Sequence, residues 1–449
     1  MKRSKNLIIL LAVLVVLIGA VVAVQVVNNA QEPVAEETPA TVCAVKAEEV
    51  TAIGWFYVDE SMAFEKTANG WAYTEDSDFP LDSSFLETML VTLAQVDAKR
   101  TIEKVENFAE FGLDDPDCVV TVQTDEILEL KFGDLSAMGD AQYVSNGDGN
   151  VYLVDLTIQD SFELGLYDVV RMETLPVMET KQIAMITKGE EVTTLLRQEN
   201  SDLAYSNKYV WFLHNGDSYQ TLDTELTENW LNSIAELSWS SCVDHNAEES
   251  ELEAYGLAEP AAVITFVYLD KSGNSTTFSL EFGKVSGNYC YAKLAGSAMV
   301  YKVDAHILDS LQNTTYFDLR PDEVLLMDWK VLTGLDVTLD GVTYEFRKAE
   351  GQDEYHMNLN GAEAEITVLR NMLNEMATTG HADGTVPEQN AGITFKFYQN
   401  SETFPEVELV FYPYNSTDYL TTVNGEAKHF VSQERVNNII QVAKTIVGA

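Results

Sequence analysis

The chain has 449 residues, of which 46% are hydrophobic and 22% charged, and this ordinary globular composition excludes wholesale disorder. Its 27 Lys and Arg against 72 Asp and Glu give a formal net charge of −45. That charge argues against a nucleic-acid binder, because phosphate recognition needs a basic face. The 4 cysteines are too few for a disulfide scaffold, and without a Cys-x-x-Cys or Cys/His cluster they argue against structural zinc.

The first predicted element is a membrane anchor. Residues 1–6, the predicted cytoplasmic tip, carry Lys2, Arg3 and Lys5, and an uncharged apolar run follows from Leu7 to Val27. As a helix, this run would span about 32 Å, which matches a bilayer core. The preceding cations predict that the N-terminus stays in the cytoplasm and that the rest lies outside. A cleaved signal peptide remains the alternative, although its apolar core is usually shorter.

A flexible stalk is predicted next, over residues 28–47, which are rich in Ala, Glu, Pro, Thr and Val and show no apolar period. The remainder of the chain is strongly acidic. We interpret this as a soluble, self-repelling surface outside the cytoplasm, and a role in binding cations or a cationic partner stays open.

Beyond the stalk the sequence repeats itself after about 145 residues, which predicts units at 48–178, 179–322 and 323–449. The clearest match is the aromatic-Gly-Leu-x-x-Pro motif of Phe111–Pro116 and Tyr255–Pro260. Further motifs recur in the same order: Val119–Val122 with Val263–Phe266, Leu130–Gly133 with Leu280–Gly283, Val151–Asp155 with Val300–Asp304, and Asp160–Phe162 with Asp309–Leu311. A period this long indicates tandem domains. The third unit lacks the Gly-Leu-x-x-Pro turn and is the most diverged.

Each unit also contains a predicted helix with one apolar face, because its apolar residues recur at helical spacing. These residues are Phe85, Leu86, Met89, Leu90 and Leu93, then Leu226, Trp230, Leu231, Ile234 and Leu237, then Ile366, Leu369, Met372, Leu373 and Met376. Ser83, Ser84 or Asp82 can cap the first helix, with Glu87 as a capping-box partner of Ser84. The other segments alternate polar and apolar residues, as in antiparallel strands. We therefore expect an α+β fold of antiparallel sheets, each covered by helices.

The glycines of the recurring turn have a predicted conformation. Gly112 and Gly256 follow acidic, aromatic-ended helical turns, which predicts a left-handed backbone with positive φ. The next Leu can fold back onto the helix end, and the Pro sets the chain extended. We interpret the motif as structural and not as a ligand site.

The combination of anchor, Gly-Trp before an amphipathic helix, aromatic-Gly-Leu-x-x-Pro, Phe-Gly and Val-Tyr-x-Val resembles the bacterial domain-of-unknown-function 4340 family. The resemblance is strongest over Ile53–Asp168 and Ile183–Asp318. Genes of that family are often found beside those of ABC-type transporter components similar to gliding-motility systems. The resemblance therefore implies an accessory extracytoplasmic subunit, and it supplies no catalytic residues.

The histidines do not form a recognisable catalytic or metal motif. They are His214, His245, His306, His356, His381 and His429, without an HExxH or HxH pattern. His356 is predicted to be packed in the interior. Asp244 and His245 lie near Cys242 and suggest a nucleophile–base pair, but adjacent residues rarely face each other, so we expect no catalysis there.

Two other patterns suggest ligands and are better explained by structure. Asn146–Asn150 resembles the start of a calcium loop, but Val151 stands where the loop needs glycine, so a hairpin turn is predicted. Tryptophans at Trp55, Trp71, Trp211, Trp230, Trp239 and Trp329 suggest carbohydrate stacking, whereas core packing is predicted for the second, third and fourth of them. Cys118 and Cys290 do not occupy matching positions, which favours small buried side chains over a repeated disulfide.

The sequence thus predicts a single-pass, extracytoplasmic, non-enzymatic protein that acts as an accessory or scaffold subunit of an ABC-type transport assembly. Its expected partners are the cytoplasmic membrane, through residues 7–27, and a transporter permease or related membrane protein. No catalytic, cofactor-binding or metal-binding residue is predicted. The alternative is a binding module for cell-wall glycan, peptide or another solute, and a third hypothesis is an undetected hydrolase at Asp244 and His245.

Overall fold

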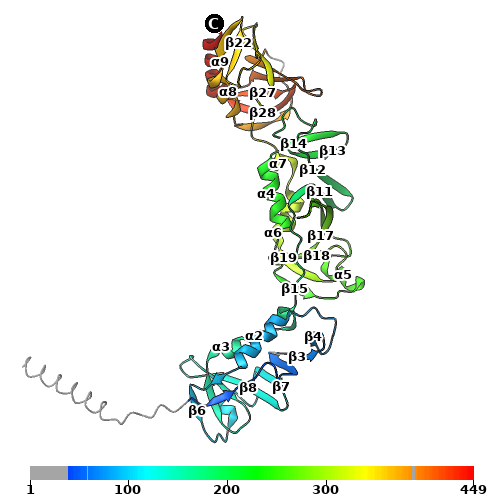
Figure 1. Ribbon diagram of the computed structural model, residues 1–449, viewed down its shortest axis with the longest axis vertical. Helices are drawn as coiled ribbons and strands as arrows, with labels where there is room; N and C mark the ends of the chain where they lie inside the picture. The colour runs from blue at the N-terminus through cyan, green and yellow to red at the C-terminus, as the bar shows by residue number, and fades with distance from the viewer. Residues whose placement is uncertain (1–38, 58, 387–389) are drawn as a thin grey trace, which may run out of the picture. The chain divides into compact units, whose positions relative to one another are not determined.

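The computed structural model describes residues 39–57, 59–386 and 390–449 (Figure 1). The described residues divide into two compact units, the first ending at Arg171 and the second beginning at Met172. The predicted cytoplasmic tip, the predicted anchor and most of the predicted stalk lie outside the described residues. Of the helices in the described part, none is both long enough and apolar enough to cross a membrane.

The first unit contains an antiparallel sheet with helices on one face (Figure 1). Its elements are β1 (Thr41–Cys43), β2 (Ala52–Tyr57), β3 (Glu60–Thr67), β4 (Gly70–Tyr73), α2 (Ser83–Leu93), β5 (Val96–Asp97), β6 (Arg100–Ile102), η1 (Phe108–Phe111), β7 (Cys118–Gln123), β8 (Ile127–Leu135), β9 (Gln142–Ser145), β10 (Val151–Val154), α3 (Leu156–Asp160) and η2 (Leu166–Val169). The large sheet has the strand order β4-β3-β2-β7-β8-β9-β10-β6.

Helix α2 confirms the predicted apolar face. Its buried residues are Leu86, Met89, Leu90 and Leu93. Asp82 is the N-cap, and its carboxylate accepts a hydrogen bond of 3.1 Å from the backbone N–H of Ser84. Ser84 is therefore inside the helix, and its predicted capping role with Glu87 is wrong.

The end of the predicted stalk is folded, so the boundary at Ala47 is wrong. β1 pairs with β5, and the side chains of Val42 and Cys43 are buried. Thr41 Oγ1 donates a hydrogen bond of 3.0 Å to Asp97 Oδ1. Composition alone does not reveal a strand whose partner lies more than fifty residues away in the chain.

The second unit contains two further sheets, and the first of these is built from residues 180–319. Its elements are β11 (Thr180–Lys188), β12 (Glu191–Arg197), β13 (Trp211–Asn215), β14 (Ser218–Leu222), α4 (Thr224–Ala235), β15 (Ser241–Asp244), α5 (Glu249–Tyr255), β16 (Ala262–Leu269), β17 (Ser275–Ser286), β18 (Tyr289–Leu294), β19 (Val300–Asp304), α6 (Ala305–Asn313) and α7 (Tyr316–Leu319). Its strand order is β14-β13-β12-β11-β16-β17-β18-β19-β15.

The last sheet is built from residues 332–447. Its elements are β20 (Leu332–Leu339), β21 (Val342–Arg347), β22 (His356–Leu359), β23 (Ala362–Glu365), α8 (Thr367–Asn374), β24 (Gly380–Gly384), β25 (Ile393–Gln399), β26 (Glu406–Pro413), β27 (Asp418–Val423), β28 (Glu426–Ser432) and α9 (Gln433–Val447). Its strand order is β23-β22-β21-β20-β25-β26-β27-β28-β24.

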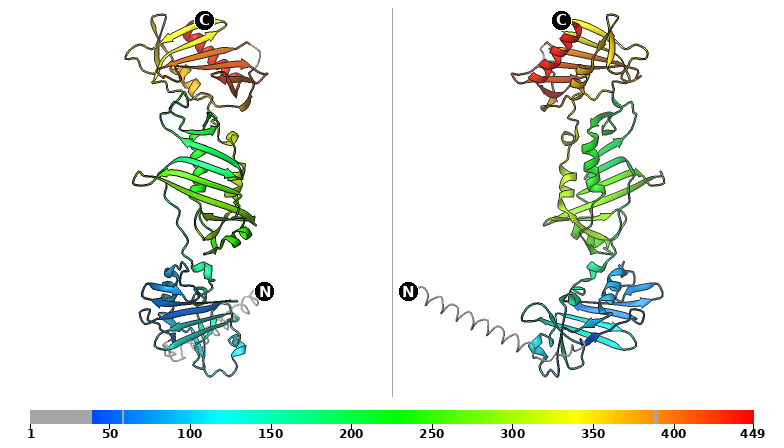
Figure 2. Two further views of the ribbon diagram at one scale, coloured as in Figure 1. Left: turned by 90° about the vertical axis from the view of Figure 1, so that its right-hand side faces the viewer. Right: turned by 60° about the vertical axis from the view of Figure 1, so that its left-hand side comes forward.

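The three large sheets of the described residues share one topology (Figure 2). In each, a meander of early strands joins a meander of late strands along a central pair, which is β2–β7, β11–β16 or β20–β25. One further strand lies between the two meanders in the sequence, namely β6, β15 or β24. In space it lies at the outer edge of the sheet, beside the last strand of the late meander. The described part of the first sheet has no counterpart of β14 and β23. The structure therefore confirms a tandem repeat of mostly antiparallel sheet with several helices.

Each sheet of the second unit buries one face under helices. In β16, the alternate residues Ala262, Ile264, Phe266 and Tyr268 are buried. Leu231 and Ile234 of α4 join the same core. In the last sheet, Val436, Ile439 and Ala443 of α9 belong to the core. The predicted alternation of strands and the predicted helix faces are confirmed, except that Leu226, predicted on the apolar face of the second helix, is 46% exposed.

Candidate functional site

The recurring turn has the predicted backbone. Gly112 and Gly256 both have φ of +69° and end η1 and α5 in the left-handed conformation. The backbone N–H of Leu257 donates a hydrogen bond of 2.8 Å to Leu252 O. Leu113 and Leu257 are each 3% exposed, as expected for a leucine that folds back onto the helix end.

The glycine of the Phe-Gly motif, which is Gly133 in the first unit and Gly283 in the second, is required because the recurring turn packs closely against it. A Cβ atom at Gly133 would lie 2.1 Å from Phe111 O, and one at Gly283 would lie 2.3 Å from Tyr255 O. The backbone of the turn therefore packs directly against the strand, with no room for a side chain between them. This contact explains the Phe-Gly motif, whose recurrence in the sequence does not by itself reveal its cause.

The residues proposed for nucleophilic catalysis form local structural contacts. Cys242 is buried, and its Sγ donates to Asp244 O at 3.4 Å. Asp244 accepts a hydrogen bond of 3.2 Å from the Tyr255 hydroxyl. Burial raises the pKa of Cys242 to about 11, so the group is a thiol at neutral pH.

The prediction that His356 is packed in the interior is wrong. Its side chain is 37% exposed, and Nδ1 lies 2.9 Å from Asp353 Oδ1. The next residue, Met357, is fully buried instead. Alternate residues of a strand face opposite sides, and the strand directs Met357 inward.

The segment Asn146–Asn150 forms the predicted hairpin between β9 and β10. Gly147 and Gly149 have positive φ, and the Asp148 carboxylate accepts hydrogen bonds from the Asn150 backbone and the Tyr152 hydroxyl. Among the described residues, no group of three or more His, Cys, Asp or Glu side chains is arranged to hold a metal ion.

The tryptophans are held mainly by internal contacts. Trp211 is 1% exposed and Trp230 packs against the same core, which confirms the prediction for both. Trp71 is only half-buried, with Lys66 Nζ 5.7 Å from the centre of its ring. Trp55 and Trp329 are buried, and their indole N–H groups donate to Leu164 O and Asn374 Oδ1 respectively.

The cysteines are buried free thiols, as predicted for Cys118 and Cys290. Burial raises the pKa of Cys43 and Cys118 to about 12, and that of Cys290 to about 11. Such thiols are poor nucleophiles and poor metal ligands at neutral pH.

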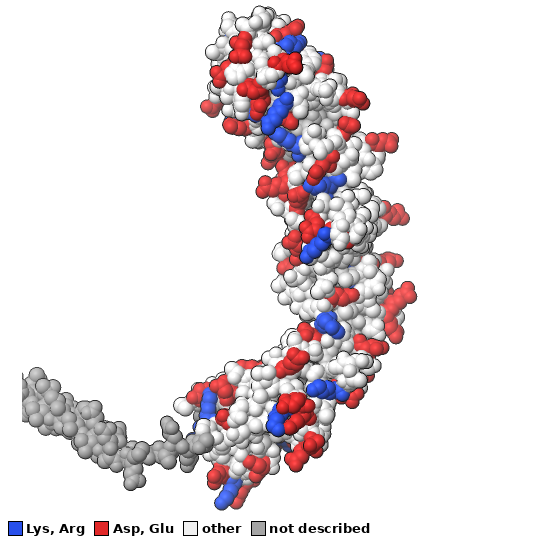
Figure 3. Space-filling model, viewed as in Figure 1, with Lys and Arg blue, Asp and Glu red and all other residues white. Residues whose placement is uncertain are grey.

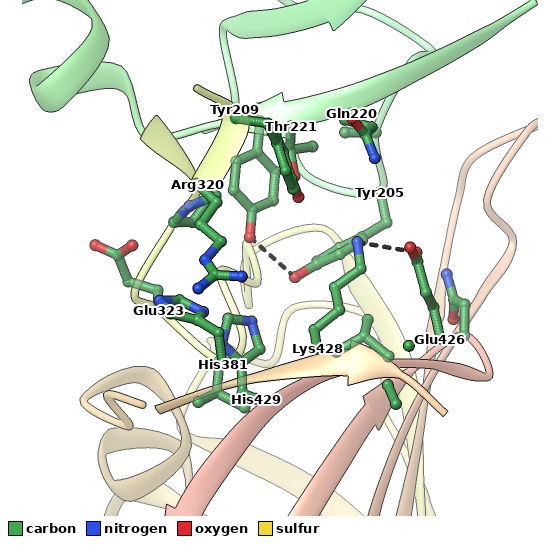
Figure 4. Close-up of a pocket in the computed structure, with 18 of the residues that line it drawn as sticks. Tyr205, Tyr209, Gln220, Thr221, Arg320, Glu323, His381, Glu426, Lys428 and His429 are labelled. Carbon is green, nitrogen blue, oxygen red and sulfur yellow. Dashed lines mark hydrogen bonds and ion pairs between the residues drawn. The ribbon is translucent and has the colours of Figure 1, made fainter. Parts of the chain in front are cut away.

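A cavity of about 840 Å³ lies between the two sheets of the second unit, and it is the candidate binding site. Its upper wall in Figure 4 comes from β14 and from the loop before β13, which carries Tyr205 and Tyr209. The opposite wall comes from β24 and β28, which carry His381 and His429. The segment after α7 contributes Arg320. This volume is typical of small-molecule sites.

The loop that carries Tyr205 also ties the two sheets together. The Tyr205 hydroxyl lies 3.3 Å from the Tyr209 hydroxyl and accepts a hydrogen bond of 3.2 Å from the backbone of Leu326. The side chain of Gln399, from the last sheet, donates to Tyr205 O at 3.0 Å. One wall of the cavity is therefore fixed by contacts with both sheets.

The cavity gathers positive groups in an acidic chain. Arg320, Lys428, His381 and His429 line it, together with the acidic Glu323 and Glu426. Lys428 Nζ lies 3.1 Å from Glu426 Oε2. Among the described residues Arg320 has no carboxylate in ion-pair contact, although its charge, after the hydrogen bonds from Thr315, helps to lower the pKa of the nearby Asp318. The Arg320 guanidinium instead lies 4.8 Å from the ring centre of Phe317. Elsewhere, acidic side chains are spread over the visible surface of both units (Figure 3).

The environment of His429 opposes protonation. The residue is 6% exposed, and burial, with the nearby charges of His381, Lys428 and Arg320, lowers its pKa to about 3. Its ring centre lies 5.4 Å from that of His381. His381 Nε2 in turn lies 2.9 Å from Asp322 Oδ1. This pair could not be predicted from the sequence, because the two histidines meet only through the pairing of β24 with β28.

Comparison with known proteins identifies a sequence family but no characterised relative. The family described as a domain of unknown function (DUF4340) matches residues 71–224 and 211–389, which together span more than half of the chain. No curated protein and no solved structure matches significantly. Both matches contain a copy of the glycine turn and of the Phe-Gly strand that packs on it. The chain therefore belongs to the DUF4340 family.

Proposed function

We propose that this protein is a membrane-anchored, extracytoplasmic, non-enzymatic accessory or scaffold subunit of an ABC-type transport assembly. The observation that carries the proposal is that the family motifs are used for packing within repeated sheets. Gly133 and Gly283 accommodate the turn, Leu113 and Leu257 are buried in it, and the cysteines are buried thiols. Such modules are suited to present surfaces to partners.

The sequence before the folded part supports the anchored location. Lys2, Arg3 and Lys5 precede the apolar run Leu7–Val27, a pattern typical of an anchor with a cytoplasmic N-terminus. The acidic surface suits an exported, soluble body on the other side of the membrane. The transporter partner is the implication of the family resemblance.

A crosslinking pull-down from native membranes tests the partner. The full chain, tagged at its C-terminus, is expected to recover a transporter permease or ATPase subunit. A matched variant with Leu14→Arg and Leu17→Arg interrupts the apolar run and should lose both membrane retention and the partner. Recovery of intact protein from membranes without any transporter subunit would contradict the proposal.

A second candidate function is an extracytoplasmic binding module for cell-wall glycan, peptide or another solute. The cavity between the two sheets of the second unit favours it, because aromatic and cationic side chains converge there. Thermal-shift measurements across glycan and peptide panels test this candidate. A flat response across both panels would remove its support.

A further inference from the structure

The last sheet has two histidines where the preceding sheet has Cys242 and Tyr301. Cys242 pairs with Tyr301 in β15–β19, and His381 pairs with His429 in β24–β28. Tyr301 and His429 also lie three residues before the N-cap of the helix that follows. The repeats therefore allow the two sites to be compared position by position.

In the preceding sheet, this position contacts a carboxylate from the same chain. The Tyr301 hydroxyl donates a hydrogen bond of 3.1 Å to Glu173 Oε2, and Ser297 Oγ donates one of 2.9 Å to the same oxygen. The Trp239 ring stacks on Tyr301, with ring centres 4.2 Å apart. The site is thus filled by an anionic group beside an aromatic wall.

In the last sheet, the equivalent position faces the cavity and has unpaired polar atoms. Within the described residues, the buried Nδ1 atoms of His381 and His429 and the buried Nε of Arg320 have no hydrogen-bond partner. Buried polar groups are normally paired, because an unpaired one destabilises the structure. A group that accepts hydrogen bonds from Arg320 and His429 would remove this deficit.

The charge around these atoms favours a negative group. Asp322 and Glu426 are already engaged with His381 and Lys428. Figure 4 shows the Glu323 carboxylate directed away from the two imidazoles, while the Arg320 guanidinium points toward them. A guanidinium that forms no contact ion pair is the protein group best suited to bind a carboxylate or a phosphate.

We propose that this cavity binds an organic anion, whose carboxylate or phosphate group accepts hydrogen bonds from Arg320 and His429. The body of the ligand packs against Tyr205 and Tyr209, as Trp239 packs against Tyr301 in the preceding sheet. This inference specifies the ligand class of the second candidate function. It does not depend on the transporter association.

Isothermal titration of the full chain in detergent tests the proposal, with benzoate and phenyl phosphate as anionic probes. Benzamide serves as the neutral analogue of benzoate, and inorganic phosphate as an anion without a ring. At least one ring-bearing anion should bind saturably, and about tenfold more tightly than both benzamide and inorganic phosphate. Failure of both anions to saturate below about 10 mM, or equal affinity for benzamide, would overturn the proposal.

A pair of arginine variants localises the binding. Arg320→Gln should weaken anion binding by about tenfold or more, whereas Arg347→Gln, which changes an arginine outside the cavity, should leave it unchanged. Unchanged affinity in Arg320→Gln, or equal losses in the two variants, would refute the assignment. The transporter pull-down has a separate readout, so failure of one proposal does not imply failure of the other.

Nuclear magnetic resonance of the wild-type imidazoles gives a readout that does not require a stable variant. A bound anion offsets the burial of His429, so the pKa of its imidazole should rise when benzoate or phenyl phosphate is added. The exposed His306 should not respond. Equal shifts of both histidines, or no shift of His429 at saturating anion, would contradict binding in this cavity.

Discussion

The two sheets of the second unit carry different residues at equivalent positions of their strand pairing, and one of these differences explains a family motif. Phe282 pairs with Ala262, and Phe411 pairs with Ile393 at the same place in the last sheet. The following residue is Gly283 in one sheet and Tyr412 in the other. Glycine is required only in the sheet where the Gly-Leu turn packs on the strand, so the two motifs form a single packing device.

The neighbouring cross-strand pair also differs between the two sheets. In one sheet Glu281 is opposite Lys293, and the two side chains form an ion pair of 3.0 Å that is largely buried. In the other sheet the equivalent residues are Val410 and Thr422, which are 5% and 1% exposed. The fold therefore accepts either a buried ion pair or two uncharged side chains at this position.

The largest effect is expected from Gly283→Ala, because the new Cβ would lie 2.3 Å from Tyr255 O. We expect a loss of about 3 kcal/mol in local stability. Native-state hydrogen exchange of the β17 and β18 amides measures it. Tyr412→Ala is the matched control and should cost less, since no turn packs there. Equal costs in the two sheets would refute the packing explanation.

Breaking the ion pair gives the next largest effect. Lys293→Met leaves Glu281 without its partner and should cost about 2 kcal/mol, somewhat below the usual value because Glu281 retains some exposure. Hydrogen exchange of β18 reports the loss. The double variant Glu281→Val with Lys293→Met imitates the uncharged pair of the last sheet and should recover most of the lost stability. A double variant less stable than the single one would show that the ion pair itself is required.

Substitution in the turn should cost less than substitution in the strand. Gly256→Val forces a β-branched residue into positive φ and places its Cβ 2.9 Å from Lys284 N, so we expect a loss on the order of 1 kcal/mol or more. Gly112→Val should behave alike in the first unit. Hydrogen exchange of α5 and of the η1 segment measures both. Unchanged protection in both variants would contradict the role assigned to this turn.

The smallest effect concerns pH and the His429 position. The folded-state pKa of about 3 lies below the ordinary 6.5, so the unfolded chain takes up a proton that the folded chain does not. Stability should therefore fall by about 0.7 kcal/mol from pH 7 to pH 6. Urea midpoints read from pulse hydrogen-exchange labelling of β28 measure this loss. His429→Tyr, which imitates Tyr301, should abolish it, while His306→Gln should not. A pH dependence that persists in His429→Tyr would assign the proton to another group.

Local sequence patterns were sufficient to predict the repeat, the helix faces apart from Leu226, the alternating strands and the positive φ of Gly112 and Gly256. These features depend on neighbouring residues or on comparison between copies. The facing of His356 was predicted wrongly, because it was inferred from the aromatic residues near the matching position in the other copies. The alternation of polar and apolar residues within His356–Leu359 itself directs Met357 inward. The folding of Thr41–Cys43 was missed because its partner strand is distant in the chain.

The cavity was not predictable from the sequence. Its walls come from segments around Tyr205, Arg320, His381 and His429, which are brought together only by the packing of the second unit. The histidines share no sequence motif, and no spacing rule connects His381 with His429. The signal that could have found them is the repeat itself, since aligning β19 with β28 places His429 on Tyr301.

The central pairing of each sheet has a consequence for how the protein is divided into fragments. A fragment cut at the family match, residues 211–389, would remove β11 and β12 from one sheet and β25 to β28 from the other. Both β16 and β20 would then expose a bare hydrogen-bonding edge, which invites aggregation. A fragment of residues 179–322 would instead retain every strand of its sheet, and is the better starting point for expression.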